Sequence, residues 1–311
     1  SAGWCIATPP PTAGSKRADR CRNEPARRRG VGPKKIGAVP IPFWRRLFWS
    51  GLHIPLLAVA LLAGNAALLQ LSLSKPLVVL EAFGAWIVYL LDRSLAVGPE
   101  DYLNRPGRVS WWREHRTLQR GGLAFGALLA GWATLHLRPA TLVAGAGLGL
   151  VGMLYVLPGV RLKQWGLLKP LLIAGAWSLG TTLLPVLEAG RTPGADLWLL
   201  TAYRLLWLLP NPLLADWPDR VGDLASGVRT PAVRWSYGTL RRVALGLLLG
   251  ALSLGLVLVV RLNRPVAVVD LLGVLLAGMV IGAARRAVTD EHLVLLDLLV
   301  AWPAVTAWVL G

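Results

Sequence analysis

The chain has 311 residues, of which 55% are hydrophobic and only 16% are charged, and its mean hydropathy is +0.55. Because a soluble domain carries charge on about a quarter of its residues, this composition excludes an ordinary soluble globular protein. The net charge of +17 does not indicate nucleic-acid binding, because eleven of the 33 basic residues lie in the first 46 positions and nearly all the others flank apolar runs. Basic residues at the ends of apolar runs are the orienting signal of membrane proteins.

Residues 1–44 are predicted to form a basic, disordered extension. The segment contains Pro9-Pro10-Pro11, Arg27-Arg28-Arg29 and Lys34-Lys35 with almost no apolar periodicity, so it cannot build a core. Its two cysteines, Cys5 and Cys21, have no metal-ligand spacing. Residues 45–311 are predicted to form one transmembrane domain.

The predicted domain contains nine apolar runs close to the length of about 20 residues that a helix needs to cross a bilayer. The candidate spans are 47–72, 76–97, 121–137, 139–158, 168–188, 195–214, 239–260, 265–284 and 292–310. We therefore expect an all-α, polytopic membrane bundle of about nine transmembrane helices around a central cavity.

The charges between the spans predict the orientation. If the N-terminus is inside, the inside connections hold sixteen basic residues and the outside connections hold five. The positive-inside rule then favours a cytoplasmic N-terminus and, with nine spans, an external C-terminus. The connections after spans 2 and 6 also hold six of the eight acidic residues that lie between the spans, which an orienting signal does not require.

After span 2, the sequence continues Leu91-Asp92-Arg93 and reaches Asn104-Arg105-Pro106 downstream. Asp92 has two readings, a cation ligand or the partner of Arg93 in an ion pair at the helix end. Glu100 and Asp101 lie close enough in sequence for the loop to bring them to the same cation.

Two later segments carry further basic residues. Arg161 and Lys163 follow span 4, and we interpret Lys169 as part of the positive-inside signal. Arg204 lies within span 6, where a charge is costly unless paired. We expect a buried structural pair, with Asp270 or Asp297 as the partner.

After span 6, three aspartates follow at positions i, i+3 and i+7, namely Asp216, Asp219 and Asp223. On a helix this spacing puts all three side chains on one face. Like charges so close repel one another unless a cation neutralises them, and Mg²⁺ binds carboxylates together with substrate phosphates. The alternative is a solvated helix start that favours acidic residues.

This acidic stretch resembles the second aspartate motif of the UbiA superfamily of intramembrane prenyltransferases, D-x-x-D-x-x-x-D followed by G-x-x-T. Gly227 and Thr230 also match the motif. The stretch from Tyr155 to Lys163 resembles the family's Y-x-x-P-x-x-R-L-K segment. The family's first motif, N-D-x-x-D-x-x-x-D and a later R-P step, is matched only by Asp92 and by Asn104-Arg105-Pro106, since Leu91, Leu95 and Pro99 replace its other polar residues.

The resemblance implies Mg²⁺-dependent transfer of a prenyl group from a polyprenyl diphosphate to a lipophilic, potentially aromatic, acceptor in the membrane. The catalytic and metal-binding residues implied are Asp216, Asp219, Asp223 and Asp92. The diphosphate-binding residues implied are Arg161, Lys163, Arg105 and Asn104. Trp111, Trp112 and Trp217 lie in the two acidic connections and are candidates to cap the site, whereas most of the fifteen tryptophans are explained as residues of the membrane–water interface.

The expected location is a prokaryotic inner membrane, with the N-terminus and the active-site loops in the cytoplasm. The expected partners are the prenyl diphosphate, the acceptor and the bilayer, with no nucleic acid, and the sequence does not indicate the oligomeric state. The alternative function is that of a non-catalytic UbiA-like relative that binds or carries a lipid or isoprenoid. Phospholipid head-group transfer is disfavoured, because the signature D-G-x-x-A-R is absent from the sequence.

Overall fold

The computed structural model of the chain describes residues 43–95, 97–157, 166–264 and 267–310. Within these ranges the chain forms helices and connecting turns, and no strand is present. The predicted all-α fold class is therefore confirmed. The predicted extension, residues 1–44, lies outside the described residues except for its last two positions, which begin the first helix. It stays a prediction.

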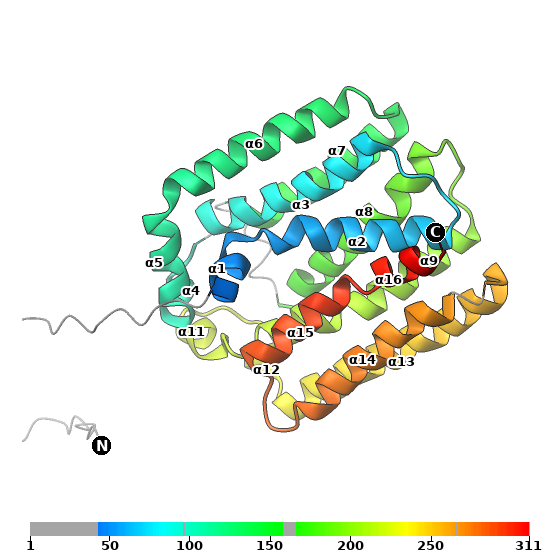
Figure 1. Cartoon of the computed structure of the whole chain (residues 1–311). Helices are drawn as coiled ribbons and strands as arrows, with labels where there is room; N and C mark the ends of the chain where they lie inside the picture. The colour runs from blue at the N-terminus through cyan, green and yellow to red at the C-terminus, as the bar shows by residue number, and fades with distance from the viewer. Residues whose placement is uncertain (1–42, 96, 158–165, 265–266, 311) are drawn as a thin grey trace, which may run out of the picture. The chain divides into compact units, whose positions relative to one another are not determined.

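Figure 1 shows the long helices running side by side. Those that correspond to the candidate spans are α2 (His53–Leu68), α3 (Lys75–Leu95), α6 (Arg116–Thr134), α7 (Pro139–Val156), α8 (Leu168–Glu188), α9 (Ala195–Leu208), α13 (Tyr237–Leu262), α14 (Ala267–Ala283) and α15 (Asp290–Val300). The shorter helices are α1 (Phe43–Ser50), α4 (Pro99–Asn104), α5 (Pro106–Glu114), α10 (Pro210–Ala215), α11 (Arg220–Ala225), α12 (Pro231–Arg234) and α16 (Pro303–Leu310).

The number of clear membrane spans is smaller than the nine predicted. In the described part of the chain, four helical segments are long and apolar enough to cross a membrane: α7, α8, α13 and the stretch Asp290–Val309 formed by α15 and α16. The pair α1 and α2, bent by 69°, makes a fifth if it counts as one span. Helices such as α3 and α6 carry charged residues near their ends, and α9 and α14 are short. The protein is a multi-pass α-helical membrane protein, but the count of nine is not confirmed.

The helices pack through small and apolar side chains. Helix α3 lies against α2 and α6, α8 lies between α7 and α9, and α13 contacts α9 and α14. The largest buried cluster joins α9, α13 and α14 through residues such as Leu200, Leu248 and Val274. Outward side chains such as Leu128, Val260 and Met279 are more than two-thirds exposed. An apolar surface of this kind is compatible with lipid hydrocarbon rather than with water.

The core also contains a buried ion pair, as predicted for Arg204. Its guanidinium is fully buried and donates to both carboxylate oxygens of Asp270, at 2.6 and 3.1 Å. Asn65 accepts a further hydrogen bond from Arg204 at 2.6 Å, and Tyr203 and Thr306 donate to Asp270. The partner is Asp270 and not Asp297. Because every charged atom has a partner, this network stabilises the packing of α2, α9, α14 and α16.

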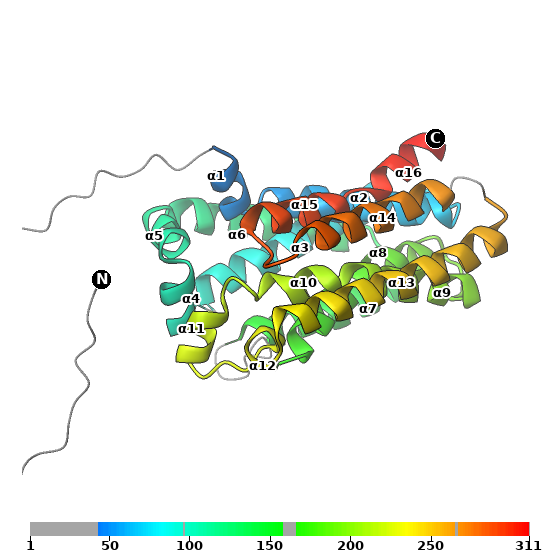
Figure 2. The same cartoon turned by 90° about the horizontal axis from the view of Figure 1, so that it is seen from below.

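The two ends of the bundle differ. Figures 1 and 2 show the short helices α4, α5 and α11 at one end. At the other end, Arg191 donates to the carbonyls of Leu69 and Gln70, and Arg264 donates to that of Ala67. The connections predicted to share one side of the membrane are therefore grouped together. Which end faces the cytoplasm stays a prediction.

Candidate functional site

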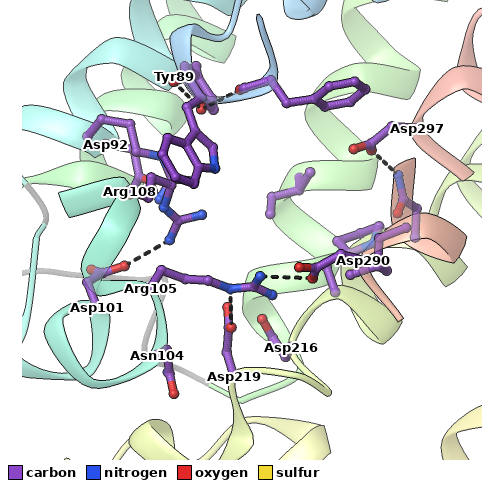
Figure 3. Close-up of a pocket in the computed structure, with 18 of the residues that line it drawn as sticks. Tyr89, Asp92, Asp101, Asn104, Arg105, Arg108, Asp216, Asp219, Asp290 and Asp297 are labelled. Atoms are coloured by element: carbon purple, nitrogen blue, oxygen red, sulfur yellow. Dashed lines mark hydrogen bonds and ion pairs between the residues drawn. The ribbon is translucent and has the colours of Figure 1, made fainter. Parts of the chain in front are cut away.

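A cavity of about 580 Å³ opens at the end of the bundle that carries α4 and α11. Figure 3 shows its polar side chains. All six candidate residues within the described ranges line it: Asp92, Asn104, Arg105, Asp216, Asp219 and Asp223. The cavity thus brings together two sequence regions that are more than 100 residues apart. Arg161 and Lys163 lie outside the described residues, and their role stays a prediction.

The three aspartates do not lie on one continuous helix. Helix α10 ends at Ala215, residues 216–219 form turns, and α11 begins at Arg220. Pro218 explains the break, because it has no backbone N–H to donate and disfavours a helical conformation at the preceding residue. The turn keeps a near-helical backbone, with φ of −78° at Asp216 and −90° at Asp219. The expectation of one helical face is therefore wrong in detail, although all three side chains line the same cavity.

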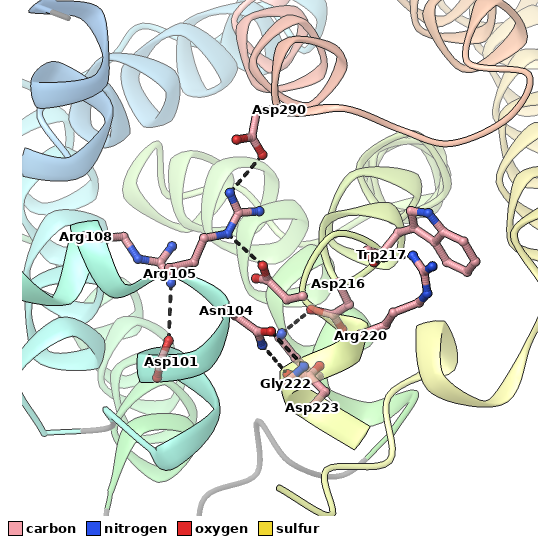
Figure 4. Close-up of polar contacts among 12 residues, drawn as sticks. Asp101, Asn104, Arg105, Arg108, Asp216, Trp217, Arg220, Gly222, Asp223 and Asp290 are labelled. Atoms are coloured by element: carbon pink, nitrogen blue, oxygen red, sulfur yellow. Dashed lines mark hydrogen bonds and ion pairs between the residues drawn. The ribbon is translucent and has the colours of Figure 1, made fainter. Parts of the chain in front are cut away.

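Asn104 holds α4 against α11, as Figure 4 shows. Its side-chain nitrogen donates to Asp223 at 3.0 Å, and its side-chain oxygen accepts from the backbone N–H of Gly222 at 2.9 Å. A Cβ on Gly222 would lie 2.3 Å from that oxygen, so a larger residue there would have to displace the Asn104 side chain. Thr230 lies within 3.4 Å of the other oxygen of Asp223. The asparagine thus fixes the last aspartate of the motif.

Arg105 connects the acidic turn to helix α15. Its Nε donates to Asp219 at 2.7 Å, and one terminal nitrogen donates to Asp290, the first residue of α15, at 2.8 Å. Figures 3 and 4 show the guanidinium between the two carboxylates. The side chain is about one-quarter exposed, so it can contact a ligand in the cavity.

Asp216 is the most buried aspartate of the motif, with 3% of its surface exposed. One carboxylate oxygen accepts from Lys169, at the start of α8, and the other is buried with no hydrogen-bond partner in the described part of the chain. Burial raises the pKa of Asp216, and Lys169 opposes the rise. Burial, followed by the negative charge of Asp216, raises the pKa of Asp223 to about 6. A cation in the cavity would relieve both effects.

The side of the cavity that corresponds to the first motif carries ion pairs. Asp92 lies 3.5 Å from Arg93, which is the helix-end pair considered from the sequence. Asp101 accepts from Arg108 at 3.2 Å, and both of these residues, together with Glu100, line the cavity. The loop therefore does bring Glu100 and Asp101 to the site. The carboxylate of Asp101 lies beside the cationic guanidinium of Arg108.

The remaining wall is aromatic. It is formed by Trp44, Phe48, Trp49 and Tyr89, with Tyr155 near Lys169. The tryptophans expected to cap the site lie elsewhere. Trp111 and Trp112 are buried residues of α5, and Trp217 packs against Tyr237 and Arg220. That expectation is wrong, because proximity in sequence to the acidic residues does not determine which face of α5 packs inward.

The charge of the cavity favours a bound cation. Its described lining contains eight carboxylates and five lysine or arginine side chains, a formal excess of three negative charges. No three acidic, histidine or cysteine side chains in the described ranges lie close enough to share one ion. A site with one or two carboxylates suits Mg²⁺, which completes its coordination with substrate phosphates and water. The free oxygen of Asp216 fits this requirement.

Several cavity residues were not identified from the sequence. Lys169 was attributed to the positive-inside signal, yet it pairs with Asp216 inside the cavity. Asp290 and Asp297 also line the cavity, Asp297 as an acceptor from Asn211 at 2.6 Å. One lysine at the start of an apolar run looks the same whether it orients the helix or contacts a ligand. No sequence signal available for these residues separates the two roles.

Comparison with known proteins reveals similarity in structure but not in sequence. No protein-family model matches the chain, and no curated protein matches it by sequence. The apo structure of a UbiA homologue from Aeropyrum pernix K1 superposes with a TM-score of 0.62 at 14% identity, covering 83% of this chain and 98% of that chain. A UbiA homologue from Archaeoglobus fulgidus gives 0.60 at 13% identity, covering 85% and 98%.

The Archaeoglobus fulgidus homologue is also known bound to DMAPP and Mg²⁺, and that structure matches with a TM-score of 0.58 at 13% identity, covering 85% of this chain and 98% of the other. At such low identity, the similarity demonstrates a shared fold. The resemblance inferred from the aspartate motif is confirmed at this level: the chain is a membrane protein with the UbiA fold.

Proposed function

We propose that this protein is a prenyltransferase of the UbiA superfamily that transfers a prenyl group from a polyprenyl diphosphate to a lipophilic acceptor within the membrane. The observation that carries the proposal is the single cavity in which the aspartates of the second motif meet Asn104, Arg105 and Lys169. This cavity combines carboxylates for a metal, cations for a diphosphate and an aromatic wall for an isoprenoid chain.

The carboxylates are suited to hold Mg²⁺ between the protein and a diphosphate. The candidate ligands are Asp216, Asp219, Asp223 and Asp92, of which one or two would bind a given ion, because no three described acidic side chains lie close enough to share one. The bound metal would neutralise the phosphate oxygens and so assist departure of the diphosphate. The formal negative excess of the described lining supports this assignment, as does the unpartnered oxygen of Asp216.

The basic and amide side chains would bind the diphosphate. Arg105 and Asn104 now contact Asp219 and Asp223, and both groups could share their remaining N–H donors with phosphate oxygens. Arg161 and Lys163 are proposed to contribute from the segment after α7. A guanidinium that bonds a carboxylate and a phosphate together would stabilise the charge that grows on the leaving group.

The proposed reaction breaks the bond between C1 of the prenyl chain and the diphosphate oxygen, with the electron pair leaving on the diphosphate. The acceptor then forms a bond to C1 and loses a proton. Aromatic faces such as those of Trp49 and Tyr89 would stabilise positive charge at the allylic carbon. Exclusion of water from the cavity would keep the carbon from being captured as an alcohol.

The proposal is tested with the purified full chain in lipid nanodiscs, radiolabelled geranyl diphosphate, and Mg²⁺ or EDTA. We expect Mg²⁺-dependent binding and, with a suitable acceptor from a lipophilic panel, release of diphosphate. The Asp219→Asn variant should reduce turnover at least about a hundredfold, because it removes a charge that holds the metal. Its matched control is Asp196→Asn, an exposed aspartate that pairs with Arg261 outside the cavity lining, which should retain full activity.

A second candidate is a non-catalytic relative that binds or carries an isoprenoid lipid. The ion pairs that already neutralise Asp216, Asp219 and Asp92 favour it. A carrier would bind the prenyl diphosphate or a neutral isoprenoid without releasing diphosphate for any acceptor. Binding that is unaffected by both EDTA and Asp219→Asn would reject the enzymatic proposal in favour of this one.

A further inference from the structure

A second cavity, of about 430 Å³, lies between the end of α3, helices α4 and α5, and the start of α6. Arg93, Asp101 and Arg108 line both cavities, but Trp112, Arg113 and the α6 residues belong to the second one alone. This cavity is strongly basic. Its described lining contains one carboxylate, that of Asp101, and five arginines: Arg93, Arg108, Arg113, Arg116 and Arg120.

Only two of the five arginines have carboxylate partners. Arg93 pairs with Asp92, and Arg108 pairs with Asp101, as Figure 4 shows for the latter. In the described part of the chain, no ion pair joins Arg113, Arg116 or Arg120 to an acidic side chain. Arg116 and Arg120 are one helical turn apart, so they share a face at the positive end of the α6 dipole.

Buried donors in the same lining also lack partners. Trp112 is 5% exposed, and its indole nitrogen has no hydrogen-bond partner among the described residues. The Nε of Arg93 is likewise buried without a partner in those ranges. Leaving a buried donor unpaired is destabilising, and an acceptor from outside the chain would remove that cost. A charge that only orients the protein in the membrane requires neither a cavity nor a buried free donor.

The geometry points to a binding site for a phosphate group, formed by Arg113, Arg116 and Arg120 with the indole N–H of Trp112. A phosphate offers several negative oxygens to a set of donors that contains almost no acceptor. Two sources share this chemistry, the head group of an anionic phospholipid and a free phosphate. Leu118, Phe125 and Leu128 on α6 are at least half exposed, so acyl chains could lie along the helix that supplies the arginines.

The site is separate from the proposed reaction, so the proposal does not depend on prenyl transfer. It predicts that the full chain, in neutral detergent, binds dioleoyl phosphatidic acid more tightly than dioleoyl phosphatidylcholine, as measured by native mass spectrometry. The Arg116→Gln/Arg120→Gln variant should weaken that binding by roughly tenfold or more, because it removes two charged donors. Trp112→Phe, which keeps the ring but removes the N–H, should weaken it by a smaller factor.

The matched control is Arg285→Gln/Arg286→Gln, which removes the same charge from exposed residues between α14 and α15 and should leave the affinity unchanged. Thermal unfolding checks that the variants remain folded. Calorimetry with inorganic phosphate distinguishes the sources. If inorganic phosphate binds and its binding depends on Arg116 and Arg120, the ligand is a soluble anion. If inorganic phosphate does not bind while phosphatidic acid binds tightly, the ligand is a lipid. The proposal is overturned if the Arg116→Gln/Arg120→Gln variant and the Arg285→Gln/Arg286→Gln control bind phosphatidic acid with equal affinity and also bind inorganic phosphate with equal affinity.

Discussion

At the scale of single residues, the ion pair between Lys169 and Asp216 links the stability of the protein to the presence of a metal ion in the cavity. Asp216 is 3% exposed, and Lys169 is its ion-pair partner. The aspartate therefore depends on a nearby cation, whether that is the lysine or a metal. A substitution of Lys169 therefore tests whether a metal ion reaches Asp216, through stability alone and without an assay of activity.

Lys169→Met should destabilise the protein by roughly 3–5 kcal/mol in EDTA, because it leaves a buried carboxylate uncompensated. Added Mg²⁺ should restore part of the loss by replacing the missing charge. Thermal unfolding in detergent with and without Mg²⁺ measures both effects. Lys169→Arg keeps the charge and should show little dependence on the metal. An identical loss with and without Mg²⁺ would indicate that no cation reaches Asp216.

The sequence identified some of the cavity residues and missed others for a physical reason. Asp216, Asp219 and Asp223 were identified because three acidic residues in eight positions repel one another and need a counter-charge. Asn104 and Arg105 were identified only through the resemblance. Lys169 and Asp290 were missed, because a lone charge at the start of a helix also suits the membrane interface or the helix dipole.

At the scale of elements, the contact between α4 and α11 assembles the site. The Gly222→Ala variant should displace the Asn104 side chain from its contacts with α11, since the new Cβ would lie 2.3 Å from the side-chain oxygen of Asn104. We expect a stability loss of about 1–3 kcal/mol and a larger, at least tenfold, loss of prenyl diphosphate affinity. Binding of the labelled diphosphate and thermal unfolding measure the two effects. Gly121→Ala, in open space on α6, is the control and should alter neither.

The buried network around Arg204 ties four helices together in the core. Arg204→Met should cost about 3–5 kcal/mol, because Asp270 would remain charged in an apolar environment. The combined Arg204→Met/Asp270→Leu variant should recover part of this loss. Unfolding titrations in mixed micelles provide the free energies. The exposed pair of Arg261 and Asp196 is the control, and Arg261→Met should cost no more than about 1 kcal/mol. Equal costs for the two single variants would exclude a special role for the buried network.

At the scale of the whole molecule, the grouping of charges predicts the orientation in the membrane. In a background with Cys5→Ser and Cys21→Ser, the exposed positions Thr192 and Ala225 are each changed to cysteine. A membrane-impermeant maleimide should label Thr192→Cys on intact cells, and Ala225→Cys only after permeabilisation, because the arginine-rich connections remain in the cytoplasm. The reverse pattern would place the cavity on the external side.

The membrane character and the all-α class could be predicted from the sequence, and the acidic residues of the cavity could be proposed from it, because hydropathy and the spacing of like charges are local properties of a chain. The sequence did not determine how many helices are long and apolar enough to cross the bilayer, because bends and breaks such as those at Gly51 and Pro210 are set by packing.

Which charged side chains form ion pairs is seen only in the tertiary structure. Asp216 pairs with Lys169, Asp219 with Arg105, and Arg204 with Asp270, across sequence separations of 47, 114 and 66 residues. Contacts between distant segments depend on how whole helices pack against each other. A pattern of neighbouring residues carries little information about that packing.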